Sequence, residues 1–120
     1  MQHIGIDIIE IARIKRAIAR RGDSFLQRVY TESELRLYHE KPSSLAARFA
    51  GKEAVVKALG ITKGINLKEI EILSNPSGKP SVRLHGKAQS QAKDLGLDSL
   101  AISLSHSKEY AVAFASAETK

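Results

Sequence analysis

The sequence predicts a single α+β domain, residues 1–120, in which long N-terminal helices pack on a small antiparallel sheet. Three observations support this fold class. Apolar residues recur at helical spacing through the first half of the chain, whereas a turn-rich segment separates two short apolar runs in the second half. Near the C-terminus, two stretches alternate between large apolar and small residues, which is typical of an antiparallel hairpin. The length of 120 residues also suits one domain with its own core.

Apolar spacing and capping residues predict the N-terminal elements. The opening segment QHIGIDIIEI is rich in isoleucine, which indicates a strand that leads into a helix at about residues 9–21, ended by Gly22. The apolar stripe of that helix comprises Ile11, Ile14 and Ile18. A short amphipathic segment follows at residues 25–29. Thr31 and Glu34 have the spacing of a capping box, which predicts a further helix through about residue 40.

The remaining elements are predicted in the same way. A strong helix is expected at about residues 44–59, closed by Gly60. Two short strands, at residues 70–73 and 82–84, flank a turn, and a polar-faced helix follows at residues 86–95. The large residues of the final hairpin are Leu100, Ile102 and Leu104, then Tyr110, Val112 and Phe114.

Composition limits the kind of protein this can be. Hydrophobic residues make up 42% of the chain and charged residues 27%, as in an ordinary globular domain. No apolar run approaches the roughly 20 residues that span a bilayer, and Asp7 and Glu10 interrupt the N-terminal apolar stretch in a way that a signal peptide would not. Because the chain has no cysteine, disulfides and thiolate metal sites are excluded. We therefore expect a cytoplasmic protein that does not interact with a membrane.

An excess of positive charge points to an anionic partner. The formal net charge is +6 and the pI is near 9.7, which suits nucleic acid, a phosphorylated ligand or an acidic protein. Part of this charge lies on the first predicted helix, where Arg13, Arg16 and Arg20 fall nearly opposite the apolar stripe. Such a stripe can equally be a solvated face that keeps the protein in solution. Aromatic residues make up only 5% of the chain, so a surface for stacking bases is poorly supplied.

Two carboxylates are the leading candidates for chemistry. Asp7 lies in an otherwise apolar strand, where an ionised carboxylate needs a partner, although it could also cap the first helix. Glu53 falls at the edge of the apolar stripe of the strong helix, so it should be partly desolvated. That stripe comprises Leu45, Phe49 and Val56. Lys57, one turn further on, could simply form a surface pair with Glu53 worth about 0.2–0.5 kcal/mol.

Taken together, the two carboxylates suit a magnesium ion. Mg²⁺ usually takes one or two protein carboxylates and completes its octahedron with water and phosphate oxygens. Lys57, Lys52 and Arg48 could then neutralise the phosphates that the metal does not reach. This pattern predicts a substrate that contains a diphosphate, but it leaves the reaction open. Alanines at positions 46, 50, 54 and 58 also indicate that another backbone or subunit packs closely against the same helix.

Four segments, in the same order, resemble those of a known enzyme family. The N-terminal GIDIIEIARI and the central RFAGKEAVVKA resemble the two signatures of the holo-(acyl-carrier-protein) synthases, the small single-domain 4′-phosphopantetheinyl transferases. The other two segments contain Gly78, Lys79 and Pro80, and His106. The resemblance covers essentially the whole chain. It implies the fold of this family and its activity, which moves 4′-phosphopantetheine from coenzyme A to a serine of apo acyl carrier protein in fatty-acid biosynthesis.

The resemblance also implies roles for individual residues. Asp7 and Glu53 would hold Mg²⁺, which also binds the coenzyme A pyrophosphate, and Lys57 would contact that pyrophosphate. His106, at the tip of the final hairpin, would contact coenzyme A, although an exposed turn histidine has no obligatory role. The further coenzyme contacts would be Arg48, Lys52, Gly78, Lys79 and Pro80. Alternatively, Arg48 and Lys52 could be solvated charges on a helix, and Gly78, Lys79 and Pro80 could form a simple turn between strands.

The same resemblance gives the basic helix a partner. Relatives use the corresponding helix to hold the acidic helix of acyl carrier protein. The carrier contacts would be Arg13, Arg16, Arg20, Phe25 and Arg28, of which Arg13 matches best. Family members of this size form homotrimers with active sites at subunit interfaces, which implies a homotrimer here. The acceptor of the serine proton stays open between Glu53 and a metal-bound water held by Asp7.

Three other functions compete with this one. A nucleic-acid-binding protein would explain the arginines but neither Asp7 nor Glu53, and we expect no nucleic-acid partner. A magnesium-dependent hydrolase of a nucleotide diphosphate would share the metal site, and would consume coenzyme A without a carrier protein. A purely structural trimer would need neither the metal nor the coenzyme.

Overall fold

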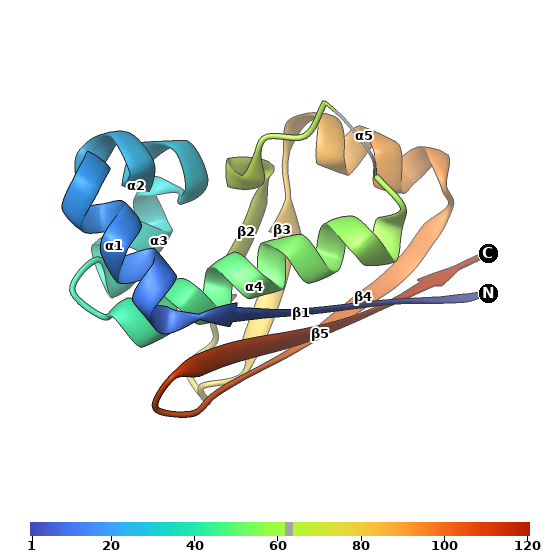
Figure 1. Cartoon of the computed structure of the whole chain (residues 1–120). Coiled ribbons are helices and arrows are strands. Elements are labelled where there is room, and N and C mark those ends of the chain that lie inside the picture. The colour runs from blue at the N-terminus through green and yellow to red at the C-terminus, as the bar shows by residue number, and fades with distance from the viewer. Residues whose placement is uncertain (62–63) are drawn as a thin grey trace.

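One long helix and a three-stranded sheet organise the molecule, which a computed structural model describes over residues 1–61 and 64–120 (Figure 1). The helices are α1 (Ile11–Arg21), α2 (Asp23–Val29), α3 (Glu32–Tyr38), α4 (Pro42–Leu59), a short 3-10 helix η1 (Leu67–Glu69) and α5 (Gly86–Asp94). The strands are β1 (Gln2–Glu10), β2 (Ile70–Ser74), β3 (Pro80–Leu84), β4 (Leu97–His106) and β5 (Tyr110–Thr119). The α+β class is confirmed. Helices α1, α2 and α3 gather at one end of α4, and both chain termini lie at the other end (Figure 1).

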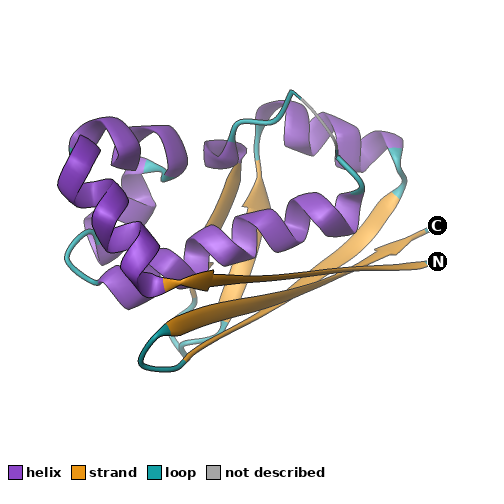
Figure 2. Ribbon diagram, in the orientation of Figure 1, coloured by secondary structure: helices purple, strands orange, loops and turns teal. Residues whose placement is uncertain are grey.

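The strands form two separate antiparallel sheets (Figure 2). In the larger one, β5 is central and pairs with β1 on one side and β4 on the other. The register places Gly5 opposite Ala115 and Asp7 opposite Ala113. Strands β2 and β3 form the second sheet, joined by the predicted turn. The N-terminal strand therefore completes a sheet whose other two strands come from the C-terminus.

Helix α4 lies against the three-stranded sheet through small residues on both elements. The buried alanines are Ala46, Ala47, Ala50, Ala54 and Ala58 on α4, and Ala111, Ala113, Ala115 and Ala117 on β5. At Gly5 the approach is so close that an added Cβ would lie 1.9 Å from the backbone oxygen of Ala54. The inference that another backbone packs on the alanine face of this helix is confirmed, and that backbone is β1.

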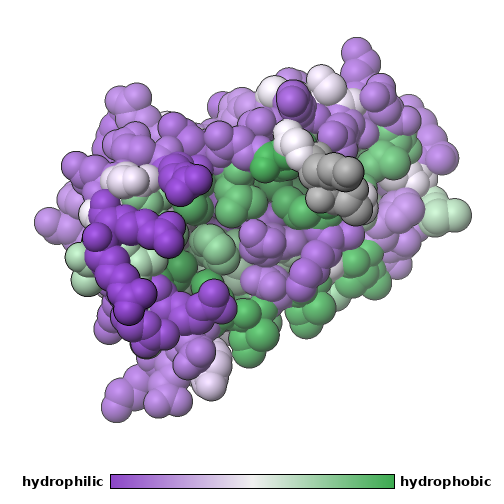
Figure 3. Space-filling view, turned by 45° about the horizontal axis from the view of Figure 1, so that its top comes forward, coloured by the Kyte–Doolittle hydropathy of each residue, from purple (hydrophilic) through white to green (hydrophobic). Residues whose placement is uncertain are grey.

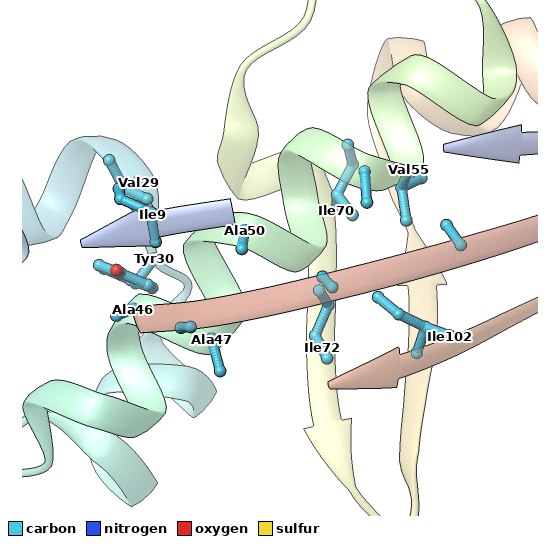
Figure 4. Close-up of a cluster of buried hydrophobic side chains, with 14 of the residues drawn as sticks. Ile9, Val29, Tyr30, Ala46, Ala47, Ala50, Val55, Ile70, Ile72 and Ile102 are labelled. Carbon is cyan, nitrogen blue, oxygen red and sulfur yellow. The ribbon is translucent and has the colours of Figure 1, made fainter. Parts of the chain in front are cut away.

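Helix α4 is also buried where β2 of the second sheet and β4 of the larger sheet meet it. Ile72 of β2 and Ile102 of β4 pack over Gly51, within the same cluster as Ile70 and Val55 (Figure 4). Because two layers cover the helix, it lacks the single apolar stripe that the sequence predicted. Of the three stripe residues Leu45 is fully buried, whereas Phe49 and Val56 are only half-buried.

The helix boundaries agree with the predicted caps, but the predicted long N-terminal helices are not confirmed. Gly22 and Gly60 end α1 and α4 with positive φ angles of 53° and 67°. Thr31 and Glu34 form the predicted capping box at the start of α3. Helices α1, α2 and α3 have only 11, 7 and 7 residues, and among the described helices only α4, with 18, is long.

The face of the larger sheet that points away from α4 is apolar and open. Ile4, Ile6 and Ile8 of β1 are 56%, 58% and 63% exposed, and Phe114 of β5 is 43% exposed. A row of hydrophobic side chains also projects along the lower edge of the molecule in Figure 3. None of the helices in the described part of the chain has both the length and the apolar character needed to cross a membrane. We call the surface formed by these four residues the open sheet face.

Candidate active site

Strand β1 and helix α4 bring three of the predicted site residues together. The close contact at Gly5 sets β1 directly on α4, and Asp7, two residues later, points to the same side of the strand. The ammonium of Lys57 lies 3.1 Å from Asp7 Oδ1 and also donates to the backbone oxygen of Ile6 at 2.9 Å. Among the residues that the structure describes, Lys57 pairs with Asp7 and not with Glu53 one turn away. The surface ion pair between Glu53 and Lys57 that the spacing allowed therefore does not form.

The environment of Asp7 excludes one of the two roles drawn from the sequence and agrees with the other. The side chain lies within β1, which continues to Glu10, so it does not cap the first helix. Its neighbours Ile6 and Ile8 point to the opposite face and are exposed. The Asp7 side chain itself is 19% exposed and has the Lys57 ammonium as the partner that a carboxylate in this strand was expected to need.

Glu53 completes this cluster as a half-buried carboxylate. Burial raises the pKa of Glu53, and the negative charge of Asp7 raises it further, while the Lys57 ammonium acts in the opposite direction. The two carboxylates are therefore close enough to repel each other, and a cation would relieve that repulsion. We call Asp7, Glu53 and Lys57 the carboxylate cluster.

The carboxylate cluster fits what magnesium requires of a protein. Among the described residues, no group of three or more His, Asp or Glu side chains could hold a metal ion. An ion at this place would have Asp7 and Glu53 as its ligands, and would need oxygen atoms from water or substrate to complete its shell. This is the usual arrangement for Mg²⁺ at a phosphate-containing substrate.

A second group of predicted residues lines a small pocket on another side of α4. The pocket has a volume of about 180 Å³. Four of the residues predicted to contact coenzyme A line it, namely Arg48, Gly78, Pro80 and His106. Lys79 lies in the same turn but is exposed and is not part of the lining. The turn is held by the Asn75 side chain, which accepts hydrogen bonds from the backbone of Ser77 and Lys79, both at 3.0 Å.

Arg48 is the charged residue at this pocket, and it is not a solvated helix charge. It is 7% exposed, and its Nη2 donates to the hydroxyls of Tyr38 at 3.0 Å and Ser74 at 2.8 Å. Its guanidinium lies over the Tyr38 ring, 3.9 Å from the centroid. We call Arg48 with its two partners the arginine cluster.

Lys52 has a different role from the predicted one. Its side chain is 0% exposed, and the ammonium donates to Glu34 Oε1 at 2.8 Å and to two backbone oxygens, of Leu67 at 3.0 Å and Ile70 at 2.5 Å. Burial lowers the pKa of Lys52, and the Glu34 charge opposes this. With its donors occupied inside the core, Lys52 cannot reach a coenzyme phosphate, and that prediction is wrong. Apart from the capping role of Glu34, no local pattern in the sequence indicates this buried pair.

The basic face of the first helix forms largely as predicted. Arg13, Arg16 and Arg20 are exposed on α1, and Arg28 is exposed on α2. Phe25 is the exception, because it is only 8% exposed and its ring meets that of Tyr30 edge-on at 6.2 Å. Phe25 therefore packs mainly in the core, and its role as a carrier contact stays a prediction.

The two clusters occupy different faces of one helix. Arg48 and Glu53 are five residues apart on α4, which corresponds to about 140° around a helix axis. Arg48 bonds to Ser74 at the end of β2, whereas Glu53 lies beside Asp7 of β1. One ligand molecule would therefore have to reach around α4 to contact both clusters of the same chain.

The comparisons identify the class of protein that this fold and site define. The chain belongs to the 4′-phosphopantetheinyl transferase superfamily, whose family model matches residues 3–115. It is 52% identical to the holo-[acyl-carrier-protein] synthase of Dehalococcoides mccartyi over 98% of this chain and 99% of that one. It is also 47% identical to the enzyme of the same name from Herpetosiphon aurantiacus, with 92% of this chain and 93% of the relative covered.

A solved structure agrees with these relatives. The holo-[acyl-carrier-protein] synthase of Helicobacter pylori in complex with coenzyme A superposes with a TM-score of 0.87 at 35% identity. The match covers 96% of this chain and 99% of that one. The resemblance to the holo-(acyl-carrier-protein) synthases seen in the sequence is therefore confirmed over nearly the full length.

Proposed function

We propose that this chain transfers the 4′-phosphopantetheine group from coenzyme A to a serine of apo acyl carrier protein in fatty-acid biosynthesis. The products are holo acyl carrier protein and adenosine 3′,5′-bisphosphate. The observation that carries the proposal is the carboxylate cluster, in which Asp7, Glu53 and Lys57 meet where β1 packs on α4. The full-length likeness to enzymes of this name, one of them solved with coenzyme A, supports the choice of substrates. We also propose that the reaction takes place in the cytoplasm.

The chemistry is a transfer of one phosphoryl group with its pantetheine arm. The serine hydroxyl oxygen forms a bond to the β-phosphorus, the bond to the bridging oxygen breaks, and the adenosine bisphosphate leaves with the electron pair. When Mg²⁺ is bound by Asp7 and Glu53, it supplies positive charge that stabilises the pyrophosphate oxygens. Lys57 adds a second, fixed positive charge at the same place.

The serine proton must go to a base. Two candidates remain for this base, Glu53 itself and a water molecule held by Asp7, since both would lie beside the reacting phosphate. Arg48, Gly78, Pro80 and His106 would hold other parts of coenzyme A in the pocket that they line. The exposed arginines of α1 would attract the acidic carrier protein, and such steering weakens as salt rises.

We further propose that the enzyme is a homotrimer whose active sites form between subunits. The open sheet face supports an interface, because Ile4, Ile6, Ile8 and Phe114 would otherwise remain in water. The separation of the two clusters around α4 supports shared sites, since the carboxylate cluster of one subunit could face the arginine cluster of the next. Coenzyme A would then bridge two chains.

The proposed transferase differs from a hydrolase in whether it consumes coenzyme A when no carrier protein is present. The enzyme is incubated with coenzyme A and Mg²⁺, with and without apo acyl carrier protein, and adenosine 3′,5′-bisphosphate is measured by chromatography. We expect release only with the carrier protein, and none with the Asp7→Ala variant. Release without a carrier would favour a hydrolase and would contradict the transfer.

A further inference from the structure

The arginine cluster joins three elements that are distant in the sequence. Tyr38 is the last residue of α3, Arg48 lies on α4, and Ser74 is the last residue of β2. The Tyr38 hydroxyl oxygen accepts hydrogen bonds from Arg48 Nη2 at 3.0 Å and from the backbone N–H of Ser74 at 3.2 Å. Arg48 Nη2 also donates to Ser74 Oγ at 2.8 Å. The three residues therefore form a closed set of contacts around one guanidinium.

These contacts fix the guanidinium in two independent ways. The Tyr38 ring lies 3.9 Å from the guanidinium carbon and fixes its plane through a cation–π contact. The two hydroxyls engage Nη2 and thereby fix rotation within that plane. A free arginine side chain loses conformational freedom when it binds a ligand, and a side chain that is already held avoids most of that cost.

One nitrogen of this held arginine has no partner. Arg48 Nε is buried and makes no hydrogen bond within the described part of the chain. A buried donor without an acceptor is costly, so its presence on a residue that lines a pocket indicates that a ligand oxygen completes it. Since the donor is cationic and the pocket also contains His106 and the backbone of Gly78, an anionic group fits best.

Coenzyme A offers two separate anionic groups, the pyrophosphate and the 3′-phosphate of its ribose. The carboxylate cluster, with its fixed Lys57 ammonium, is suited to the pyrophosphate. The arginine cluster lies about 140° away around α4 in the same chain. In the proposed trimer, a coenzyme A whose pyrophosphate is held at the carboxylate cluster of one subunit would therefore meet the arginine cluster of the next subunit with its other anionic group. The 3′-phosphate is the anionic group that remains.

We propose that Tyr38 and Ser74 are positioning residues that hold Arg48 ready for the 3′-phosphate, and so set the preference for coenzyme A over 3′-dephospho-coenzyme A. This inference rests on the proposed function for the identity of the ligand. Tyr38 does not line the pocket and acts only through the guanidinium that it holds, whereas Ser74 both holds the guanidinium and lines the pocket.

Substitutions at both positions test this role. Tyr38→Phe keeps the ring and removes the hydroxyl, and Ser74→Ala removes the second acceptor. We expect each to raise KM for coenzyme A on the order of fivefold, the effect of one lost hydrogen bond, while kcat stays within about twofold. KM for 3′-dephospho-coenzyme A should not change. Tyr38→Leu, which also removes the ring, should have a larger effect of the same kind.

The controls remove similar groups outside the arginine cluster. Ser81→Ala deletes an exposed hydroxyl on β3, and Leu37→Ala truncates an exposed side chain beside Tyr38. Both should leave the two KM values unchanged. A merely structural role would raise both KM values alike or lower kcat. That result, or no change in either KM, would overturn the proposal.

Direct binding separates this proposal from the proposed function. Adenosine 3′,5′-bisphosphate and adenosine 5′-phosphate, which lacks the 3′-phosphate, are titrated into each variant by calorimetry. We expect the wild type to prefer the bisphosphate, and Tyr38→Phe and Ser74→Ala to lose most of that preference. The result stands even if the wild type proves unable to transfer the pantetheine arm. Equal affinities of the wild type for the two nucleotides, or an unchanged preference in the variants, would overturn the positioning role.

Discussion

The ammonium of Lys57 lies 3.1 Å from a carboxylate oxygen of Asp7, although fifty residues separate them in the sequence. The contact exists because β1 lies directly on α4, with Gly5 against the backbone of Ala54. Lys57 is further held by the backbone oxygen of Ile6 at 2.9 Å. The charges of the carboxylate cluster are thus in place before any ligand arrives, which favours electrostatic stabilisation of a transition state.

Asp7→Asn should abolish most of the activity without unfolding the protein. The amide keeps the shape of the side chain but removes the charge that pairs with Lys57 and that would hold Mg²⁺. We expect kcat/KM to fall by about 100-fold or more, since charge stabilisation at such sites is worth several kcal/mol. Steady-state kinetics on apo acyl carrier protein measure this. Asp98→Asn, an exposed aspartate on β4, should retain full activity, and an active Asp7→Asn enzyme would contradict the role of Asp7.

Gly5→Ala should damage both stability and activity. Its Cβ would lie 1.9 Å from the Ala54 backbone oxygen, so β1 must move away from α4. We expect a loss of about 1–3 kcal/mol in the free energy of unfolding and a fall in activity as Asp7 leaves Glu53.

A second glycine substitution, with a similar expected loss in the free energy of unfolding, serves as the control for Gly5→Ala. Gly96→Ala adds a Cβ whose nearest contact is 3.9 Å away, but at a positive φ of 77°. It should also lose about 1–2 kcal/mol, yet keep its activity. Urea unfolding and kinetics on both variants measure this. Equal activities of the two variants would show that the close approach at Gly5 does not position the site.

Arg13→Glu should weaken recognition of the carrier protein. Arg13 is exposed on α1 in line with Arg16 and Arg20, and reversing its charge opposes an acidic partner. We expect KM for acyl carrier protein to rise on the order of tenfold at low salt and the effect to shrink at high salt, with KM for coenzyme A unchanged. Lys93→Glu on α5 is the control. If both substitutions act equally, net charge alone would explain the effect and the α1 surface would have no special role.

Ile6→Asp should disrupt assembly. Ile6 is 58% exposed at the centre of the open sheet face, and a charge there would be buried in any interface that this face forms. We expect sedimentation to show a monomer in place of a trimer, together with a loss of activity of more than about tenfold. Leu37→Asp, at a leucine 51% exposed on α3, should remain trimeric. A wild type that sediments as a monomer would contradict the proposed assembly outright.

Glu71 should make the fold sensitive to acid. Burial alone raises the pKa of Glu71, but hydrogen bonds from the Thr31 hydroxyl, at 2.6 Å, and from His85 outweigh it and hold the pKa below its ordinary value of 4.5. The ionised form therefore stabilises the fold, fully above pH 4.5, and this contribution is lost as the pH falls through the lowered pKa.

The Glu71→Gln variant tests this dependence. It should lower the free energy of unfolding on the order of 1 kcal/mol at pH 7, and the difference from the wild type should shrink below pH 4.5. Urea unfolding across this pH range, with Glu109→Gln as an exposed control, measures it. A difference that grows towards low pH would contradict the assigned sign.

Local signals were enough to predict most element boundaries. Gly22, Gly60 and the capping box at Thr31 act within a few residues, so the sequence shows them directly. Which face of a strand is buried depends on partners that are distant in the sequence. On β5 the small residues such as Ala113 face α4, whereas Phe114 is exposed, because the close contact with α4 leaves no room for larger side chains.

Only part of the candidate site could be predicted, because some of its contacts join residues that are distant in the sequence. Asp7, Glu53 and Lys57 belong to two segments that resemble those of a known family. That resemblance predicted that the three residues share one site. The motif did not reveal that Lys52, next to Glu53, points into the core and pairs with Glu34. Neither Tyr38 nor Ser74 lies in a recognised segment, so their contact with Arg48 depends on the packing of three elements.

The most direct test of the proposed transfer is the intact mass of apo acyl carrier protein after incubation with this enzyme, coenzyme A and Mg²⁺. We predict a gain of about 340 Da, the mass of one phosphopantetheinyl group, and no gain when EDTA is present. An unchanged mass with folded enzyme and several carrier proteins would contradict the proposed function.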